Sequence, residues 1–242
     1  MKKRFLALLL AAVSVFQLCG TVLAKEEVAE FPTESIENSE GMDASQFKER
    51  GLELLEKGNA LIKARDAKIL DFNRYYQDDS RWKDAKLAEG ETMGAYGCAI
   101  TSFAMVQSYL AGFAGTKKYN PLQLYKKYPT LTYPSLYWDS LAAQFDEMEK
   151  WFYSDEIMSY VEVAPYVAGL IEDETPVIIG LKSSTGRTHF VVAYGYAGSA
   201  VYIYDPQKSV NKSTLAGYAS QFDLGVYKVI AYSNRDLRDS VA

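Results

Sequence analysis

The sequence predicts an α+β fold in which helices come first and an antiparallel sheet follows. Three observations carry this prediction. Apolar residues recur at helical spacing through residues 43–70 and 97–111. The run PVIIGL at 176–181 is continuous, apolar and rich in β-branched residues, which is typical of a buried strand. Beyond it, segments 188–196 and 200–205 flank an Ala-Gly-Ser turn and predict a β-hairpin.

The first 24 residues have the pattern of a secretory signal peptide. Three basic residues precede an apolar run at 5–18, and small residues lead to Ala24. We expect cleavage there and a secreted, extracellular protein of a bacterial cell. The run is short for a membrane anchor, and no later stretch is apolar enough to span a bilayer. No stable membrane insertion is therefore expected after cleavage.

Two segments are expected before the main domain. Residues 25–42 are acidic and polar, which predicts a solvated linker. Residues 43–70 predict an amphipathic helical segment, with Ser45 as a plausible N-cap. This segment could pack on the domain as an ordinary helix, or it could be a pro-segment that covers an active site.

The main domain is expected to span residues 71–242. A helix over 97–111 is predicted to end at Gly112. Asn120 and Pro121 are expected to open a second helix, as cap and first helical residue. The remaining elements are predicted to be a helix capped by Ser135 that runs through Phe145, a short helix at 165–171 and a last strand at 226–232.

Composition excludes several classes of function. The 242 residues carry a formal net charge of −5, so there is no basic surface for nucleic acid. The chain has two cysteines and one histidine, which are too few for a zinc site built from these ligands. Neither a phosphate-binding loop nor a G-x-S-x-G motif is present. We therefore expect no metal and no cofactor.

Cys98 is a candidate nucleophile. It would be the only thiol left once Cys19 is removed with the signal peptide. It follows Gly97 at the start of the predicted helix, where unpaired backbone N–H groups favour a thiolate. A small buried residue without chemistry is an equally good interpretation from position alone.

His189 is the only imidazole that could accept a proton from Cys98. If the hairpin turn is centred at Gly198, position 189 falls opposite 207, and Asp205 becomes a diagonal neighbour of His189 on the same face. A carboxylate there could orient the imidazole. Alternatively, Asp205 and Pro206 only open a turn, and a register shift of one residue would separate the pair.

These residues give the chain a resemblance to the C39-like cysteine peptidases, within the papain-like superfamily. The matching text over roughly 71–232 is YYQ at 75–77, Trp82, YGCAITS at 96–102, PVIIG at 176–180, HFVV at 189–192 and VYIYDP at 201–206. The resemblance implies a papain-like fold, with the nucleophile at a helix N-terminus packed on an antiparallel sheet. It also implies Cys98 as nucleophile, His189 as general base, Asp205 as orienting acid and Gln77 as the oxyanion-hole donor. Apart from the resemblance, Gln77 would be interpreted as a surface residue.

The expected function is that of a secreted cysteine peptidase, which hydrolyses peptide or amide bonds through a thioester intermediate. Its expected partner is a peptide or protein substrate. A cell-wall amidase or transpeptidase on the same fold is an alternative, and a catalytically silent binding module is another.

Overall fold

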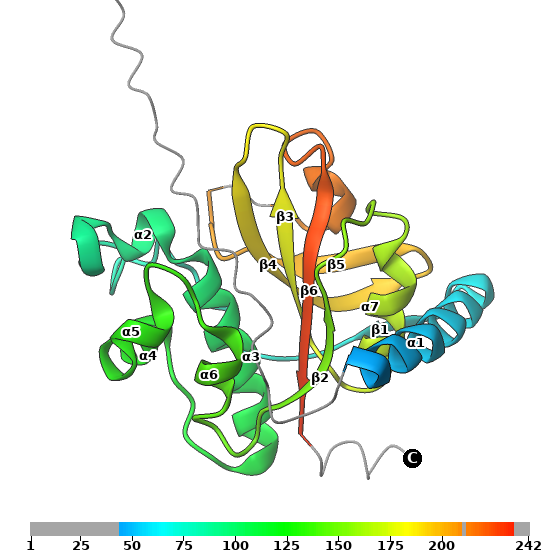
Figure 1. Ribbon diagram of the computed structural model, residues 1–242, viewed down its shortest axis with the longest axis horizontal. Coiled ribbons are helices and arrows are strands. Elements are labelled where there is room, and N and C mark those ends of the chain that lie inside the picture. The colour runs from blue at the N-terminus through cyan, green and yellow to red at the C-terminus, as the bar shows by residue number, and fades with distance from the viewer. Residues whose placement is uncertain (1–43, 210–211, 235–242) are drawn as a thin grey trace, which may run out of the picture. The chain divides into compact units, whose positions relative to one another are not determined.

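The computed structural model describes residues 44–209 and 212–234, so the predicted signal peptide and acidic linker lie outside the described residues. It has an α+β architecture built on one antiparallel sheet (Figure 1). The strand order is β1-β4-β3-β6-β2, and β5 pairs with β4. The strands are β1 (Ala67–Ile69), β2 (Glu149–Ser154), β3 (Val177–Lys182), β4 (Thr188–Ala197), β5 (Ala200–Tyr204) and β6 (Gly225–Ser233).

Helices lie on both sides of the sheet (Figure 1), with α2 to α6 on one side and α1 and α7 on the other. Their bounds are α1 (Ala44–Ala64), α2 (Met93–Tyr96), α3 (Cys98–Ala114), α4 (Pro121–Lys127), α5 (Pro129–Thr132), α6 (Trp138–Ala142) and α7 (Val163–Glu172), with short 3₁₀ turns η1 (Ala88–Gly90) and η2 (Leu215–Tyr218). Residues 177–181 of β3 are all buried, because both faces of this central strand are covered.

Some predicted elements differ from the structure at their ends. The helix expected over 43–70 ends at Ala64, because Arg65 adopts a left-handed backbone with φ of 60°. Residues 67–69 then form β1, which pairs with the end of β4. The prediction also missed β2, which pairs with β6 at the edge of the sheet.

Two predicted helix boundaries are wrong. Gly112 lies inside α3, and the helix ends instead at Gly115, whose φ of 66° suits glycine. Ser135 caps no helix, because α6 begins only at Trp138. The boundary at Asn120 is confirmed, since its side chain accepts from the backbone of Gln123 and forms a capping box that opens α4.

Helix α1 packs closely against α7. A Cβ added to Gly58 would lie 1.8 Å from the carbonyl oxygen of Pro165, and one added to Gly169 would lie 2.9 Å from that of Leu54. Glycine at both positions therefore lets the two backbones approach each other. Figure 1 places this pair across the sheet from α2 and α3. The arrangement supports the interpretation of α1 as an ordinary packed helix over that of a pro-segment.

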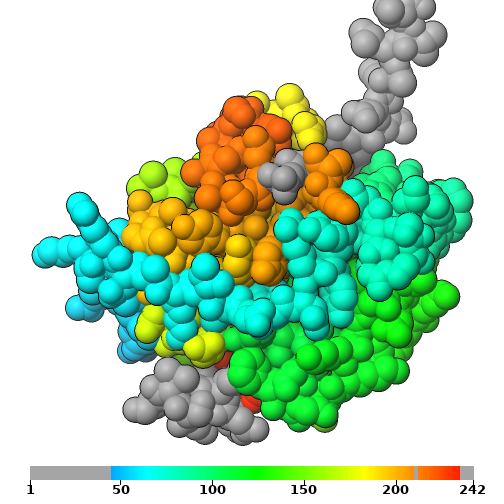
Figure 2. All heavy atoms as spheres, turned by 180° about the vertical axis from the view of Figure 1, so that it is seen from behind, coloured from blue at the N-terminus to red at the C-terminus, as the bar shows by residue number. Residues whose placement is uncertain are grey.

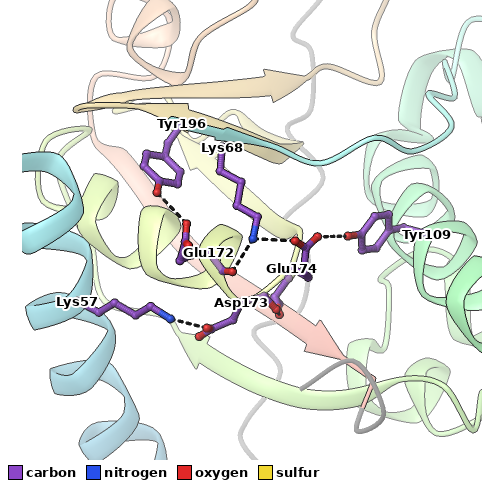
Figure 3. A network of polar contacts seen from close by, with 8 residues as sticks. Lys57, Lys68, Tyr109, Glu172, Asp173, Glu174 and Tyr196 are labelled. Atoms are coloured by element: carbon purple, nitrogen blue, oxygen red, sulfur yellow. Dashed lines mark hydrogen bonds and ion pairs between the residues drawn. The ribbon is translucent and has the colours of Figure 1, made fainter. Parts of the chain in front are cut away.

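A polar network fastens the end of α7 to its surroundings (Figure 3). Three consecutive carboxylates at 172–174 contact side chains from α1, β1, α3 and β4. We call this set the α7 network; its pairs are Lys57–Asp173, Lys68–Glu174, Tyr109–Glu174 and Tyr196–Glu172. Because these partners come from four elements, the network fixes α7 against both helices and sheet.

The segment that follows β1 joins the helical side to the sheet. Figure 2 shows it in cyan, crossing one face between the orange residues around β5 and the green helices. The Phe72 ring lies edge-on to Tyr109 of α3, at 5.1 Å between centroids, and to Tyr204 of β5, at 5.5 Å. Further along, the backbone N–H of Gln77 donates to the carbonyl of Pro206 at 2.8 Å. The segment therefore links α3 to β5 and to the residues that follow β5.

Candidate active site

Cys98 is the first residue of α3 and is half-buried. Gly97, which precedes it, donates its N–H to the carbonyl of Met93 at 2.8 Å. A Cβ at position 97 would lie 2.4 Å from that same oxygen, so only glycine fits between α2 and α3. The short helix and the glycine thus fix where α3 begins and where the Cys98 side chain leaves the backbone.

A β-bulge sets the register between β4 and β5. At the turn Ala197 pairs with Ala200, so the turn is centred between Gly198 and Ser199. The predicted centre, Gly198, lies half a residue earlier. Tyr194 is then an extra residue in β4, since the register shifts between Ala193 and Gly195. This shift of one residue restores the predicted register in the half of the hairpin that lies away from the turn, where Val192 pairs with Tyr204. Extended past the strand ends, the ladder makes His189 and Asp205 diagonal neighbours on one face.

The structure brings His189 and Asp205 into direct contact. His189 Nε2 lies 2.9 Å from Asp205 Oδ1. The histidine is 8% exposed and the aspartate 0%. The predicted pairing of these two residues therefore occurs, away from solvent.

Cys98 contacts the other side of the same imidazole. Burial on its own lowers the pKa of His189, but hydrogen bonds to Asp205 and to Cys98, together with the charges of both groups, outweigh it and raise that pKa to about 9. The imidazole is therefore protonated at neutral pH. The chain's single histidine stands between its single described thiol and a buried carboxylate.

Asp205 has further donors that the sequence analysis missed. The backbone N–H of Gln207 donates to Oδ1 at 2.6 Å, and the Tyr218 hydroxyl donates to Oδ2. Phe222 stacks on the imidazole, with ring centroids 6.0 Å apart and an angle of 17° between planes. No sequence pattern marks either aromatic residue, because the chain has 19 tyrosines and 11 phenylalanines.

Gln77 is buried at 3% exposure, which corrects the interpretation of it as a surface residue. Its side-chain Nε2 donates to the carbonyl of Gly94 at 2.8 Å. Its backbone N–H reaches Pro206, the residue after Asp205. Gln77 is therefore bonded both to α2, just before Cys98, and to the segment that carries Asp205.

Two features are absent from the described part of the chain, a cluster of metal ligands and a membrane-spanning helix. Residues 44–209 and 212–234 contain no group of three or more His, Cys, Asp and Glu side chains that could hold a metal ion. Within the same ranges, no helix has the length and apolar character needed to cross a bilayer.

Comparison with known proteins identifies the family. A crystal structure of a provisionally assigned C39-like peptidase from Bacillus anthracis aligns with a TM-score of 0.43 and 18% identity, over 70% of this chain and 98% of that chain. No curated protein gives a significant match. The family model described as "Peptidase_C39 like family" matches residues 69–233, from the last residue of β1 to the last residue of β6. The chain therefore belongs to the C39-like peptidase family.

Proposed function

We propose that this protein is a cysteine peptidase of papain-like fold in which Cys98, His189 and Asp205 act together. One observation carries the proposal. The chain's only histidine is bonded to a fully buried aspartate on one side and to Cys98, at the start of α3, on the other. This arrangement holds an imidazolium beside a sulfur that is half-buried and so still accessible to a substrate.

The proposed reaction has two steps. Cys98 Sγ, as thiolate, attacks the carbonyl carbon of the scissile peptide bond. The carbon–nitrogen bond breaks as His189 gives its proton to the leaving amine, which leaves a thioester on Cys98. His189 then takes a proton from water as its oxygen attacks the thioester. The carbon–sulfur bond breaks, the acid product leaves and the thiolate–imidazolium pair is restored.

Asp205 keeps the imidazole oriented in both steps. It bonds Nε2, which leaves Nδ1 as the ring nitrogen that faces Cys98. Its negative charge also stabilises the imidazolium.

Gln77 is the proposed side-chain donor to the oxyanion. Among the described residues its Nε2 donates to the carbonyl of Gly94, and the second N–H of this amide is the one that we assign to the substrate. The backbone N–H of Cys98, at the free end of α3, is the second donor. Both would bind the oxygen only as negative charge develops on it.

The proposed setting is outside the cell, after removal of residues 1–24, with a peptide or protein as substrate. The signal-peptide pattern supports export. The mature chain would then carry Cys98 as its one thiol, so full activity requires that thiol in reduced form.

A turnover comparison tests the proposal. The mature protein, reduced with dithiothreitol, is incubated separately with fluorescein-labelled casein and with purified peptidoglycan. We expect cleavage of casein, and we expect Cys98→Ser and His189→Ala to abolish it while the circular dichroism spectrum stays unchanged. Release of peptidoglycan fragments without casein cleavage would replace the peptidase with a cell-wall amidase.

Alkylation of Cys98 by iodoacetamide separates both enzymes from a silent binding module. We expect rapid alkylation of the native protein at neutral pH, slowed by His189→Ala. A thiol that reacts only after denaturation, and that does not respond to His189→Ala, would overturn the catalytic assignment.

A further inference from the structure

The segment that contains η2 contacts both members of the His189–Asp205 pair. Tyr218 is the last residue of η2, and Phe222 lies four residues further along the sequence. Their rings also contact each other, with centroids 5.9 Å apart. Residues 215–222 form one continuous stretch, so both contacts reach the pair from the same short segment.

Tyr218 completes the hydrogen bonding of Asp205. It is fully buried, and its hydroxyl donates to Oδ2, the carboxylate oxygen that His189 does not use. Oδ1 already accepts from His189 and from the backbone N–H of Gln207. With Tyr218 in place, both oxygens of a carboxylate without solvent contact have donors, and the rotation of that carboxylate is fixed.

Phe222 restrains the imidazole in the same way. Its ring lies nearly parallel to that of His189, at the 6.0 Å centroid distance of an offset stack. The Tyr218 ring lies 6.1 Å from the imidazole at 44°. Two aromatic rings from one segment therefore limit how the imidazole can turn.

We infer that Tyr218 and Phe222 are positioning residues of the active site: Tyr218 holds the carboxylate of Asp205 and Phe222 holds the plane of His189, so that Nε2 of the imidazole faces Asp205 while its other ring nitrogen faces Cys98. The inference rests on the proposed function, because it assigns these residues to the same reaction. Tyr218 contacts Asp205 and Phe222 contacts the ring of His189, so each acts through the residue that it holds.

Other charged and titratable groups also surround His189 and bear on any titration. Cys98 and Asp205 raise its pKa, as described above. The guanidinium of Arg187 lies over the ring of Phe222, which stacks on His189, at 5.4 Å from the centroid of the Phe222 ring. Tyr227 of β6 lies within electrostatic range of Cys98, and burial together with that charge raises the pKa of its phenol. The variants below leave these four groups in place.

Nuclear magnetic resonance tests the inference directly, because the full sequence contains one histidine. Untagged protein labelled with ¹⁵N-histidine reports on the two ring nitrogens of His189 alone. In Tyr218→Phe, Oδ2 loses its donor, and we expect the carboxylate to turn away from Nε2. The pKa of His189 should then fall by about one pH unit or more. Iodoacetamide should alkylate Cys98 about threefold to tenfold more slowly at pH 6.5.

Tyr196→Phe is the matched control. Tyr196 is also buried, and its hydroxyl also donates to a carboxylate, Oε2 of Glu172, at 3.0 Å. This pair belongs to the α7 network and not to the site. We expect Tyr196→Phe to lower the melting temperature as Tyr218→Phe does, and to leave both the His189 titration and the alkylation rate unchanged.

Phe222 provides a second test that does not depend on the folding of Tyr218→Phe. Phe222→Leu removes the flat ring and should slow alkylation about threefold, whereas Phe222→Tyr keeps the ring and should restore the wild-type rate. A His189 titration that is unchanged or moves upward in Tyr218→Phe, or equal rates in Phe222→Leu and Phe222→Tyr, would overturn the positioning role. Failure of the proposed function looks different, since wild-type Cys98 would then fail to react in the native state.

Discussion

Two sets of carboxylates in this molecule are stabilised in different ways. In the α7 network, Asp173 and Glu174 pair with lysines, and their side chains remain 27% and 30% exposed. Asp205, in contrast, is 0% exposed, and its donors are a tyrosine hydroxyl, a backbone N–H and the imidazole of His189. Asp173 and Glu174 keep contact with water and with lysines that stay charged at neutral pH, whereas Asp205 has contact with neither water nor a lysine.

The difference separates a structural ion pair from the pair that we propose to be catalytic. Partly exposed lysine pairs contribute little energy and do not respond to pH near neutrality. The charge that faces Asp205 is an imidazolium, which can lose its proton. Because the pair is buried, the interaction energy between the two groups depends strongly on that proton. The experiments below test this contrast, from the largest expected effect to the smallest.

Asp205→Asn should have the largest effect. The amide cannot stabilise an imidazolium, and its N–H favours the wrong tautomer of His189, so turnover of labelled casein should fall about 10³–10⁴-fold. Asp173→Asn makes the same chemical change in the α7 network and should leave turnover within about twofold. Similar losses in both variants would remove the contrast between the two sets.

Gln77→Ala should lower kcat by roughly 10²–10³-fold, with little change in KM, because the proposed donor acts only on the developing oxyanion. Gln144→Ala is the control, since Gln144 is exposed and also donates from its amide to a backbone carbonyl, that of Ser140. Steady-state kinetics on one peptide substrate checks both variants. Unchanged turnover in Gln77→Ala would exclude this side chain from the site.

Stability should depend on pH through His189. Its pKa is about 9 in the folded protein, above the ordinary 6.5, so protonation favours the folded state. This contribution is fully present below pH 6.5 and is lost as the pH rises through 9. Urea unfolding at pH 6 and at pH 10 should show a loss on the order of 2–3 kcal/mol. His189→Gln should lose less stability than the wild type by that amount, because the tyrosines with a raised pKa, such as Tyr109 and Tyr196, then still destabilise the fold at pH 10. Equal losses in the two proteins would contradict the raised pKa of His189.

Lys57→Met should have the smallest effect. Its ion pair with Asp173 joins α1 to α7, but the lysine side chain is 42% exposed, so the free energy of unfolding should fall by at most about 1 kcal/mol. Alkylation of Cys98 should stay at the wild-type rate. A slower alkylation would mean that the α7 network influences the site.

The sequence predicted those features that depend on neighbours along the chain. Strands β3 to β5 follow from a continuous apolar run and from a turn between two apolar segments. Their order also predicted that His189 and Asp205 would meet, because a hairpin relates positions by counting from its turn. The position of Cys98 at the start of a helix follows from the apolar pattern of α3.

The missed features depend on partners far away in the sequence. Strand β2 is a half-buried edge strand, EKWFYS, and it forms because β6 offers it a free edge. Tyr218 lies between residues with no distinctive spacing, and its role arises from where η2 folds back onto Asp205. The orientation of Gln77 likewise depends on α2 and on Pro206 together.

The extra residue at Tyr194 determines how hairpins of this kind can vary among related proteins. If Tyr194 were paired and not bulged, the ladder would continue in the register of the turn, and Asp205 would face away from His189. Loss of Tyr194, or added residues at 198–199, would leave the pairing beyond the bulge unchanged. The number of residues from histidine to aspartate is therefore free to change as long as that pairing is kept. A search for relatives that demands a fixed interval between the two residues would reject sequences that keep the pair, and a search that aligns the two strands by their pairing would retain them.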